Sequence, residues 1–168
     1  MELTGLAGPA WPRPARAVAH PRSSPGRGFN LVRSPSLKGV TVLLVDDDPD
    51  DLALVGTLLS RAGADVTAVS KVEDALRALQ SGPPRVVVSD LMIPGHDGFT
   101  LIRRIRRTED GGGHLPALAI SGYDNADQRR YALEEGFDEY LPKPVHEHIV
   151  TTVARMVFPR RRKGEIHG

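Results

Sequence analysis

The apolar residues between positions 40 and 158 fall into two kinds of segment that alternate along the chain. A near-continuous apolar run at 40–45, three consecutive valines at 86–88 and an apolar run at 115–120 are typical of strands buried on both faces of a sheet. Shorter runs at 65–69 and 138–141 bring the predicted strands to five. Each is followed by a segment with apolar residues at helical spacing; these are 49–62, 71–81, 99–107, 123–135 and 145–157. This alternation predicts a parallel sheet with helices on both faces and right-handed crossovers.

Local signals mark several of the predicted helix ends. Asp48 followed by Pro49 is typical of a helix N-cap and first helical residue, and Gly63 is typical of a helix end. Ser70 and Glu73 have the spacing of a capping box. We interpret the acidic residues 48, 50 and 51 as a solvated helix N-terminus, where the helix dipole favours negative charge.

Composition narrows the class of protein. Aromatic residues make up only 5% of the chain, so the core should consist mostly of Val, Leu, Ile and Ala. The absence of cysteine excludes a disulfide framework and a thiolate metal site, and it favours a reducing, cytoplasmic location. No stretch approaches the roughly 18 apolar residues that a membrane-spanning helix needs, so we expect no membrane span.

The distribution of charge divides the chain into three parts. Residues 1–38 form a Pro- and Arg-rich segment without helical or strand periodicity, which predicts a disordered segment or linker. Residues 39–158 form the predicted folded domain, and 159–168 a basic tail. The net charge is +5 over 1–39, −7 over the middle and +3 over the tail. An acidic domain is a poor nucleic-acid binder but a plausible cation binder.

Four of the predicted strands end in residues that can do chemistry. The first ends in Asp46 and Asp47, the third in Asp90, the fourth in Ser121 and the fifth in Lys143. Because the carboxyl ends of parallel strands share one edge, these residues should converge there. Crowded carboxylates repel one another, and bound Mg²⁺, which prefers oxygen ligands, relieves that repulsion. Such a site suits a phosphoryl group, with Asp90 as nucleophile and the metal and Lys143 neutralising charge.

Four motifs at these strand ends carry a resemblance to a known family. They are Leu-Leu-Val-Asp-Asp at 43–47, Ser-Asp-Leu-Met-Ile-Pro-Gly-His-Asp-Gly at 89–98, Ala-Ile-Ser-Gly at 119–122 and Tyr-Leu-Pro-Lys-Pro at 140–144. In this order they resemble the receiver domain of two-component response regulators, and the match covers 40–158. The resemblance implies a flavodoxin-like (βα)5 fold, a doubly wound five-stranded parallel sheet with strand order 2-1-3-4-5.

The resemblance also implies a signalling role for the site. Asp90 matches the phosphoacceptor, which takes a phosphoryl group from a histidine kinase or a histidine phosphotransfer protein. Asp46 and Asp47 match the acidic pair that holds Mg²⁺ together with Asp90, and the main-chain carbonyl of Met92 would be a further ligand. The expected protein is therefore a phosphoacceptor and not a turnover enzyme. At most it would phosphorylate itself from small donors and dephosphorylate itself.

Three further residues match the part of the family that senses phosphorylation. Ser121 matches the switch hydroxyl, at a position where threonine is common. Lys143 matches the lysine that meets the phosphoryl group. Tyr140 matches the aromatic residue that turns inward when the hydroxyl moves. In receivers this movement changes the surface formed by the fourth helix, the fifth strand and the fifth helix, which contacts downstream proteins.

Two other functions remain open at the level of sequence. Asp46 and Asp48 form an Asp-x-Asp pair after an apolar strand, as in phosphatases of the haloacid dehalogenase type. Asp50 stands where those enzymes usually have threonine or valine, no acidic pair follows Lys143, and Asp90 would be unexplained. The second alternative is a receiver-like docking module that is never phosphorylated. The sequence argues against this alternative, because the acceptor site is intact at Asp46, Asp47, Asp90, Ser121 and Lys143.

The residues after the last predicted helix bear on output. Ten residues follow Phe158, too few for a helix-turn-helix, so we expect no DNA-binding output domain. The expected mode of action is through protein partners, either as a single-domain regulator or as the receiver of a hybrid kinase. The Pro-rich stretch before Leu37 is similar to the junction that precedes receivers in hybrid kinases.

Overall fold

The computed structural model describes residues 35–93, 96–109, 113–146 and 148–158, all within one compact unit. The predicted basic tail, and the predicted N-terminal segment as far as residue 34, lie outside the described residues. The strands of the main sheet are β1 (Thr41–Val45), β2 (Asp65–Val69), β3 (Val86–Asp90), β6 (Ala117–Ser121) and β7 (Glu139–Pro142). The helices are α1 (Pro49–Arg61), α2 (Val72–Ser81), α3 (Gly98–Thr108), α4 (Ala126–Glu134) and α5 (His148–Val157).

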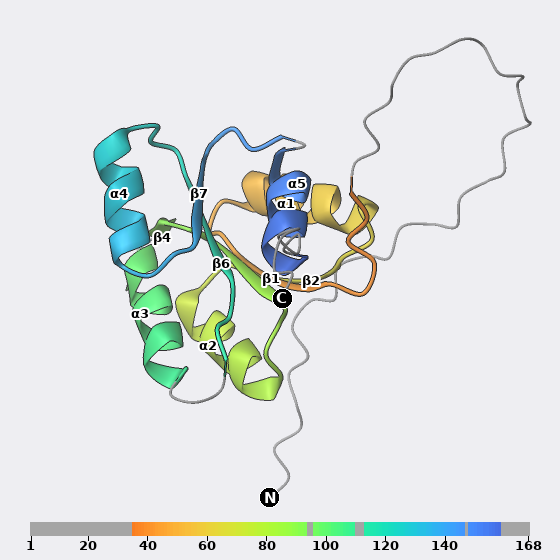
Figure 1. The fold of residues 1–168 in the computed structure, drawn as a ribbon, viewed down its shortest axis with the longest axis horizontal. Coiled ribbons are helices and arrows are strands. Elements are labelled where there is room, and N and C mark those ends of the chain that lie inside the picture. The colour runs from red at the N-terminus through yellow and green to blue at the C-terminus, as the bar shows by residue number, and fades with distance from the viewer. Residues whose placement is uncertain (1–34, 94–95, 110–112, 147, 159–168) are drawn as a thin grey trace, which may run out of the picture. The chain divides into compact units, whose positions relative to one another are not determined.

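The main sheet is parallel throughout, in the order β2-β1-β3-β6-β7 (Figure 1). Counted along the chain, these five strands have the order 2-1-3-4-5, so the predicted fold is confirmed. Val45 pairs with Ser89 and Asp90 with Ile120, so β1 and β3 end side by side in the middle of the sheet. A short antiparallel hairpin, β4 (Met92–Ile93) with β5 (His96–Asp97), follows β3 and was not predicted.

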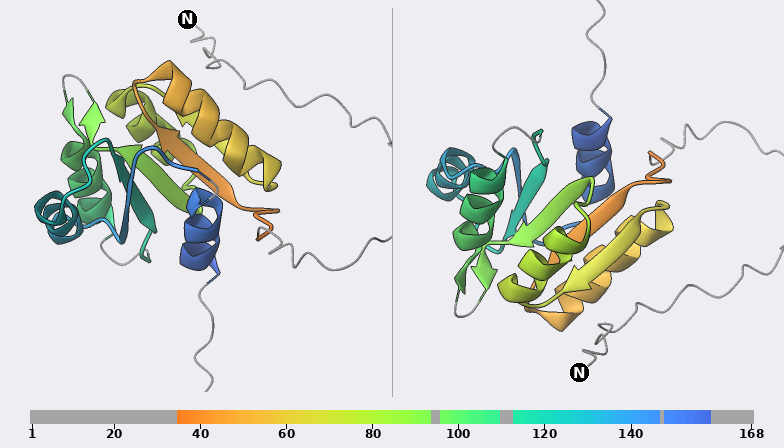
Figure 2. Two further views of the ribbon diagram at one scale, coloured as in Figure 1. Left: turned by 90° about the horizontal axis from the view of Figure 1, so that it is seen from above. Right: turned by 90° about the horizontal axis from the view of Figure 1, so that it is seen from below.

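The helices divide between the two faces of the sheet (Figure 2). Each face has its own apolar core. On one face, α1 and α5 pack against alternate sheet residues, with Val55, Leu59 and Ile149 fully buried. On the other face, α2, α3 and α4 contribute residues such as Ala75 and Ile102. Strands β3 and β6 are buried at every position, which explains their continuous apolar runs.

The predicted boundaries of α1 are confirmed within a residue. Asp48 is the N-cap and accepts hydrogen bonds from the main-chain N–H groups of Asp50 and Asp51, and Pro49 is the first helical residue. After the helix, Gly63 has a φ of +101°, in the left-handed region where a side chain would be strained. The strand-to-helix turn that carries the acidic residues is therefore held locally.

Other helix starts differ from the prediction. The N-cap of α2 is Lys71, without a side-chain cap, so the capping box predicted at Ser70 is wrong. Helix α4 begins at Ala126, not at residue 123, because the Asn125 side chain caps it by accepting from the main-chain N–H of Gln128. Helix α5 begins at His148 instead of residue 145.

The folded region also begins earlier than residue 39. Leu37 is fully buried in the core under α1, although the sequence places it in the N-terminal segment. Its main-chain N–H donates to the carbonyl of Ala62 at the end of α1, at 2.8 Å. Within the described residues, no helix is long and apolar enough to cross a membrane.

Candidate functional site

The residues predicted to carry chemistry lie at the carboxyl ends of four neighbouring strands. Asp90 is the last residue of β3 and Ser121 the last of β6, while Asp46 directly follows β1 and Lys143 directly follows β7. Each strand is held in place by its apolar residues, which anchor it in both cores. The burial of the apolar strand residues therefore determines the position of the polar residue at the end of each strand.

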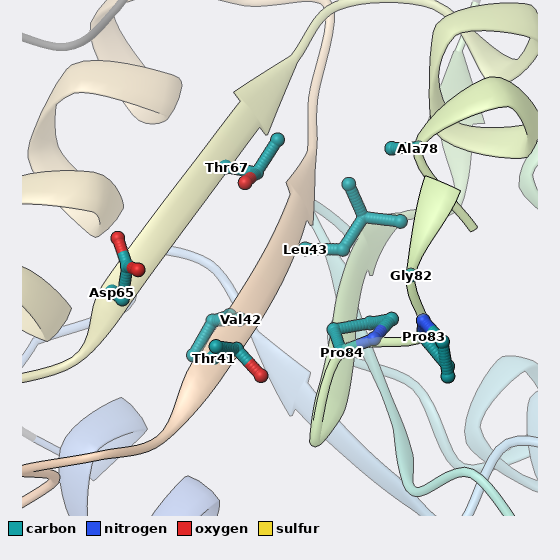
Figure 3. A pocket seen from close by; sticks show the side chains of 9 residues that line it. All are labelled: Thr41, Val42, Leu43, Asp65, Thr67, Ala78, Gly82, Pro83 and Pro84. Carbon is teal, nitrogen blue, oxygen red and sulfur yellow. The ribbon is translucent and has the colours of Figure 1, made fainter. Parts of the chain in front are cut away.

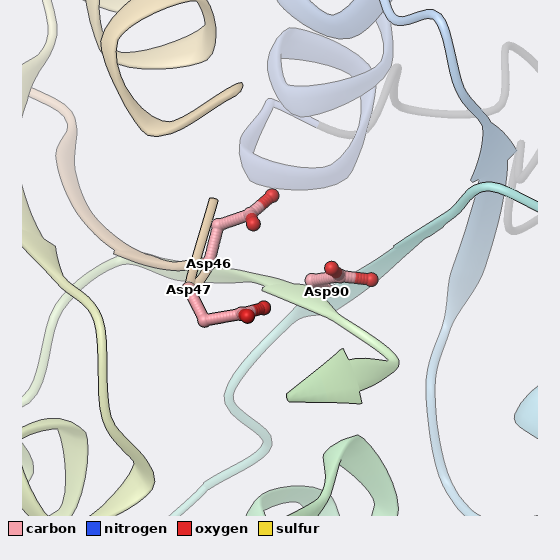
Figure 4. A group of neighbouring side chains, drawn as sticks. All are labelled: Asp46, Asp47 and Asp90. Carbon is pink, nitrogen blue, oxygen red and sulfur yellow. The ribbon is translucent and has the colours of Figure 1, made fainter. Parts of the chain in front are cut away.

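Three carboxylates meet at the ends of β1 and β3. Oxygen atoms of Asp46, Asp47 and Asp90 all lie within 4.8 Å of one another (Figure 4). Asp46 is fully buried and Asp90 nearly so, whereas Asp47 is exposed. Oδ1 of Asp46 accepts from the main-chain N–H of Asp48 at 3.0 Å, and Oδ1 of Asp90 accepts from that of Met92 at 3.1 Å. Two buried acids thus have fixed orientations, and one accessible acid stands beside them.

The ammonium group of Lys143 lies among carboxylates from three segments. Its Nζ donates to Oδ2 of Asp46 at 2.9 Å, to Oδ2 of Asp51 at 2.7 Å and to Oδ2 of Asp90 at 3.2 Å. An ammonium has three protons, so these three bonds use its full donor capacity. The lysine links the ends of β1, β3 and β7 to the first turn of α1.

Burial is the largest single influence on the pKa values of Asp46 and Lys143. It raises the pKa of Asp46 above its ordinary value, while the Lys143 ammonium partly offsets that effect and the charge of Asp90 adds a smaller increase. The repulsion expected between the carboxylates is therefore a lesser cause. Burial acts to lower the pKa of Lys143, but hydrogen bonds to Asp51 and Asp46 outweigh it, so the pKa is raised. Lys143 remains charged at neutral pH.

Ser121 and Tyr140 both contact the loop between β6 and α4. The Oγ of Ser121, which is fully buried, accepts from the main-chain N–H of Tyr123 at 3.2 Å. The buried Tyr140 donates a hydrogen bond from its hydroxyl group to the main-chain carbonyl of Tyr123. The carbonyl of Ser121 in turn accepts from the main-chain N–H of Lys143 at 2.7 Å. Residue 123 is thus a shared contact of the serine and the tyrosine.

The sequence interpretation missed Asp51 and placed Asp48 correctly. Asp51 was interpreted as part of a solvated helix terminus, but its side chain is only 35% exposed and pairs with Lys143. The only local signal was its position in the first turn of the helix that begins close to Asp46. The side chain of Asp48 is engaged in capping α1.

A separate hollow lies at the opposite end of the strands (Figure 3). Residues at the start of β1 and β2, including Thr41 and Asp65, line it together with Pro83 and Pro84. None of the strand-end residues described above belongs to its lining. This hollow is therefore distinct from the strand-end site at the carboxyl edge of the sheet.

The geometry agrees with comparisons to known proteins. The family model of the response regulator receiver domain matches residues 42–155, which include all four strand ends. The chain belongs to the response regulator receiver domain family. Receiver domains are phosphoacceptor signalling switches of two-component systems, and the matched residues of this domain include the three converging carboxylates.

Relatives with this domain differ in their overall build. The chain is 41% identical over 110 residues to an uncharacterised 14.6 kDa protein of Leptolyngbya boryana, covering 66% of this chain and 83% of that one. It is 38% identical over 120 residues to the sensor histidine kinase GacS of Pseudomonas protegens, covering 70% of this chain but only 13% of the kinase. The receiver is therefore found both in short proteins and as a small part of a long one.

A solved structure adds information about metal binding in the family. The receiver domain of the sensor histidine kinase PA1611 from Pseudomonas aeruginosa is 27% identical to this chain. It has a TM-score of 0.64 and covers 71% of this chain and 98% of its own. That structure has a magnesium ion coordinated in its active-site cleft.

Proposed function

We propose that Asp90 is the phosphoacceptor, and that it takes its phosphoryl group from a phosphohistidine of a histidine kinase or histidine phosphotransfer protein. The observation that carries this proposal is the buried Asp90 carboxylate with the Lys143 ammonium 3.2 Å away. In the transfer, an Asp90 oxygen bonds to phosphorus and the P–N bond breaks. The imidazole nitrogen keeps the bonding electron pair. The product is an acyl phosphate on Asp90.

The donor set supports a magnesium site in the same place. Asp46, Asp47 and Asp90 supply only oxygen ligands, which is the preference of Mg²⁺, and we assign the main-chain carbonyl of Met92 as a further ligand. When bound, Mg²⁺ supplies positive charge that offsets the charge on the phosphoryl oxygens. The exposed Asp47 leaves one side of the cluster open to solvent, from which an ion can enter.

Lys143 and Ser121 are the proposed partners of the phosphoryl oxygens. The Lys143 ammonium already touches the acceptor carboxylate, so only a small movement would bring it to a phosphoryl oxygen. In the bond between Ser121 and Tyr123, the serine oxygen accepts, so the serine hydroxyl proton is available for donation to the phosphoryl group.

Tyr140 would transmit the change to a protein-binding surface. Its hydroxyl joins β7 to the β6–α4 loop through the carbonyl of Tyr123, whose N–H contacts Ser121. A shift of Ser121 toward the phosphoryl group would therefore alter the loop that leads into α4. We propose that the surface formed by α4, β7 and α5 carries the signal to a downstream protein in the cytoplasm.

The competing functions make different use of the same residues. A haloacid dehalogenase-type phosphatase would need Asp48 as an acid–base group beside Asp46, but the Asp48 side chain caps α1. A docking module would have no need for a lysine bound to three carboxylates. Both facts favour a domain that accepts a phosphoryl group, without turnover of another substrate.

Labelling with a small phosphodonor tests the assignment. The full chain would be incubated with Mg²⁺ and acetyl phosphate, and a base-labile increase of one phosphoryl group mapped by mass spectrometry. We expect the label on Asp90, its loss in Asp90→Asn, and its retention in Asp127→Asn, which changes an exposed aspartate on α4. A label that maps to Asp46 would favour the phosphatase. No label from this donor or from a phosphorylated histidine phosphotransfer domain would favour the docking module.

A further inference from the structure

Asp51 makes the shortest of the three hydrogen bonds to the Lys143 ammonium. Its Oδ2 lies 2.7 Å from Nζ, compared with 2.9 Å for Asp46 and 3.2 Å for Asp90. Unlike those two residues, Asp51 is not one of the three carboxylates whose oxygens converge. It reaches the lysine from a different element, the first turn of α1.

The position of Asp51 is independent of the strand ends. Asp48 caps the helix by accepting from the main-chain N–H of Asp51 at 3.2 Å, and Pro49 restricts the backbone of the same turn. Leu52 and Val55, which follow directly, pack in the core under α1. The carboxylate of Asp51 therefore projects from a rigid turn.

A metal ion would change the competition for Lys143. Carboxylate oxygens that coordinate a cation share their negative charge with it and become weaker acceptors for an ammonium. Asp46 and Asp90 would both be affected in this way, but Asp51 would not. Among the three carboxylates, Asp51 would then be the strongest partner of Lys143 while the metal is bound.

We propose that Asp51 is a positioning residue that holds the Lys143 ammonium against the acceptor carboxylate while the metal is bound. This inference rests on the proposed function, because it concerns the rate at which Asp90 is phosphorylated. The contact to Asp51 is compatible with the contact to Asp90, since Lys143 makes both bonds at once. Asp51 therefore steadies the lysine in place and does not draw it away from the acceptor.

Two neighbouring aspartates allow a matched test. Asp51→Ala removes the contact, whereas Asp50→Ala removes the same charge from an exposed side chain in the same helical turn. Asp51→Asn keeps an oxygen acceptor and serves as the conservative variant. If Asp51→Ala does not fold, Asp51→Ser, whose side chain is shorter and uncharged, serves as the test variant. Each full-length protein would be labelled with acetyl phosphate at saturating Mg²⁺, and the rate would be measured as a function of donor concentration.

We expect the rate at saturating donor to fall about tenfold in Asp51→Ala, a loss typical of one charge-assisted hydrogen bond. The donor concentration for half-maximal rate should stay unchanged. Asp50→Ala should behave as the unaltered protein, and Asp51→Asn should recover most of the rate. The ¹⁵N-detected signal of the Lys143 ammonium, assigned with Lys143→Arg, should broaden in Asp51→Ala alone.

Specific results would overturn the inference. Equal rates for Asp51→Ala and Asp50→Ala, with an unchanged Lys143 signal, would show that the contact does not position the lysine. A faster rate in Asp51→Ala would show that Asp51 competes with the acceptor for Lys143. If the unaltered chain takes no label on Asp90, the proposed function itself fails. Normal labelling of the unaltered chain with no effect of Asp51 refutes only this inference.

Discussion

Replacement of Lys143 by methionine should destabilise the domain, and the loss should depend on pH and Mg²⁺. The lysine side chain is 15% exposed, and two of its partners, Asp46 and Asp90, are buried. Removing one partner of a buried ion pair costs about 3–5 kcal/mol, whereas an exposed pair contributes about 0.2–1 kcal/mol. The free-energy contribution of the bond to the half-buried Asp51 lies between these limits. Methionine has no charge, so the variant also avoids the desolvation cost of burying the ammonium group. We therefore expect a loss of about 3 kcal/mol in the free energy of unfolding at pH 7 without metal.

The pH dependence follows from the direction of the pKa shifts. The pKa of Lys143 is raised, so its stabilising effect is complete below the ordinary lysine pKa and is lost only as pH rises through the higher, folded-state value. Without the lysine, the pKa of the buried Asp46 should rise further. Ionisation of that carboxyl then destabilises the variant as pH increases. The difference between the two proteins should be large at pH 7 and shrink toward pH 4.

Urea unfolding at pH 7 and pH 4, each with EDTA or with an excess of Mg²⁺, measures these differences. At pH 7, Mg²⁺ should stabilise Lys143→Met more than the unaltered protein, because the ion replaces part of the missing charge. Lys71→Met, at an exposed lysine without a side-chain cap contact, is the control. A change of less than about 0.5 kcal/mol, or an equal loss at both pH values, would refute the reasoning.

Three further changes test other contacts. Because burial raises the pKa of Asp46, its ionisation opposes folding, so Asp46→Asn should be more stable than the unaltered protein at pH 7 without Mg²⁺. That advantage should vanish below pH 4, and lower stability at both pH values in urea would contradict it. Tyr140→Phe removes the hydroxyl bond to the Tyr123 carbonyl and should cost about 1 kcal/mol by urea unfolding; an unchanged midpoint would argue against a coupling role. Gly136→Ala should cost about 1–3 kcal/mol, because φ is +118° and the added Cβ would lie 3.0 Å from Cγ of Arg106; a thermal midpoint within a degree of the original would disprove it.

Much of the fold could be predicted because it depends on local patterns. The continuous runs that end at Asp46 and Asp90 require strands buried on both faces, and the alternation with helical segments requires parallel pairing. The helix starts were harder. Tyr123 and Val145 fit an apolar helical spacing, but the Asn125 cap begins α4 later, and Val145 is buried before α5 begins. Apolar spacing alone does not distinguish a helical residue from one that packs beside it.

The extent of the domain also depended on tertiary contacts. Leu37 lies between Ser36 and Lys38 in a segment without periodicity, so nothing in its neighbourhood indicates burial. The core beneath α1 covers it, and the carbonyl of Ala62 holds its main chain. A single apolar residue becomes part of a core only when an element from elsewhere in the chain packs against it.

The sequence by itself determined which chemical groups stand at the strand ends, because strand burial and turn residues act over a few neighbouring positions. The sequence also placed Asp48 as the N-cap of α1, because capping is a local interaction. Only the tertiary structure decided that Asp51 reaches Lys143, 92 residues away in the chain, while Asp50 stays exposed. Asp50 and Asp51 share the same local signal. They differ because the packing of α1 against the sheet directs the two side chains to different places, and the order of the strands brings β7 to meet one of them.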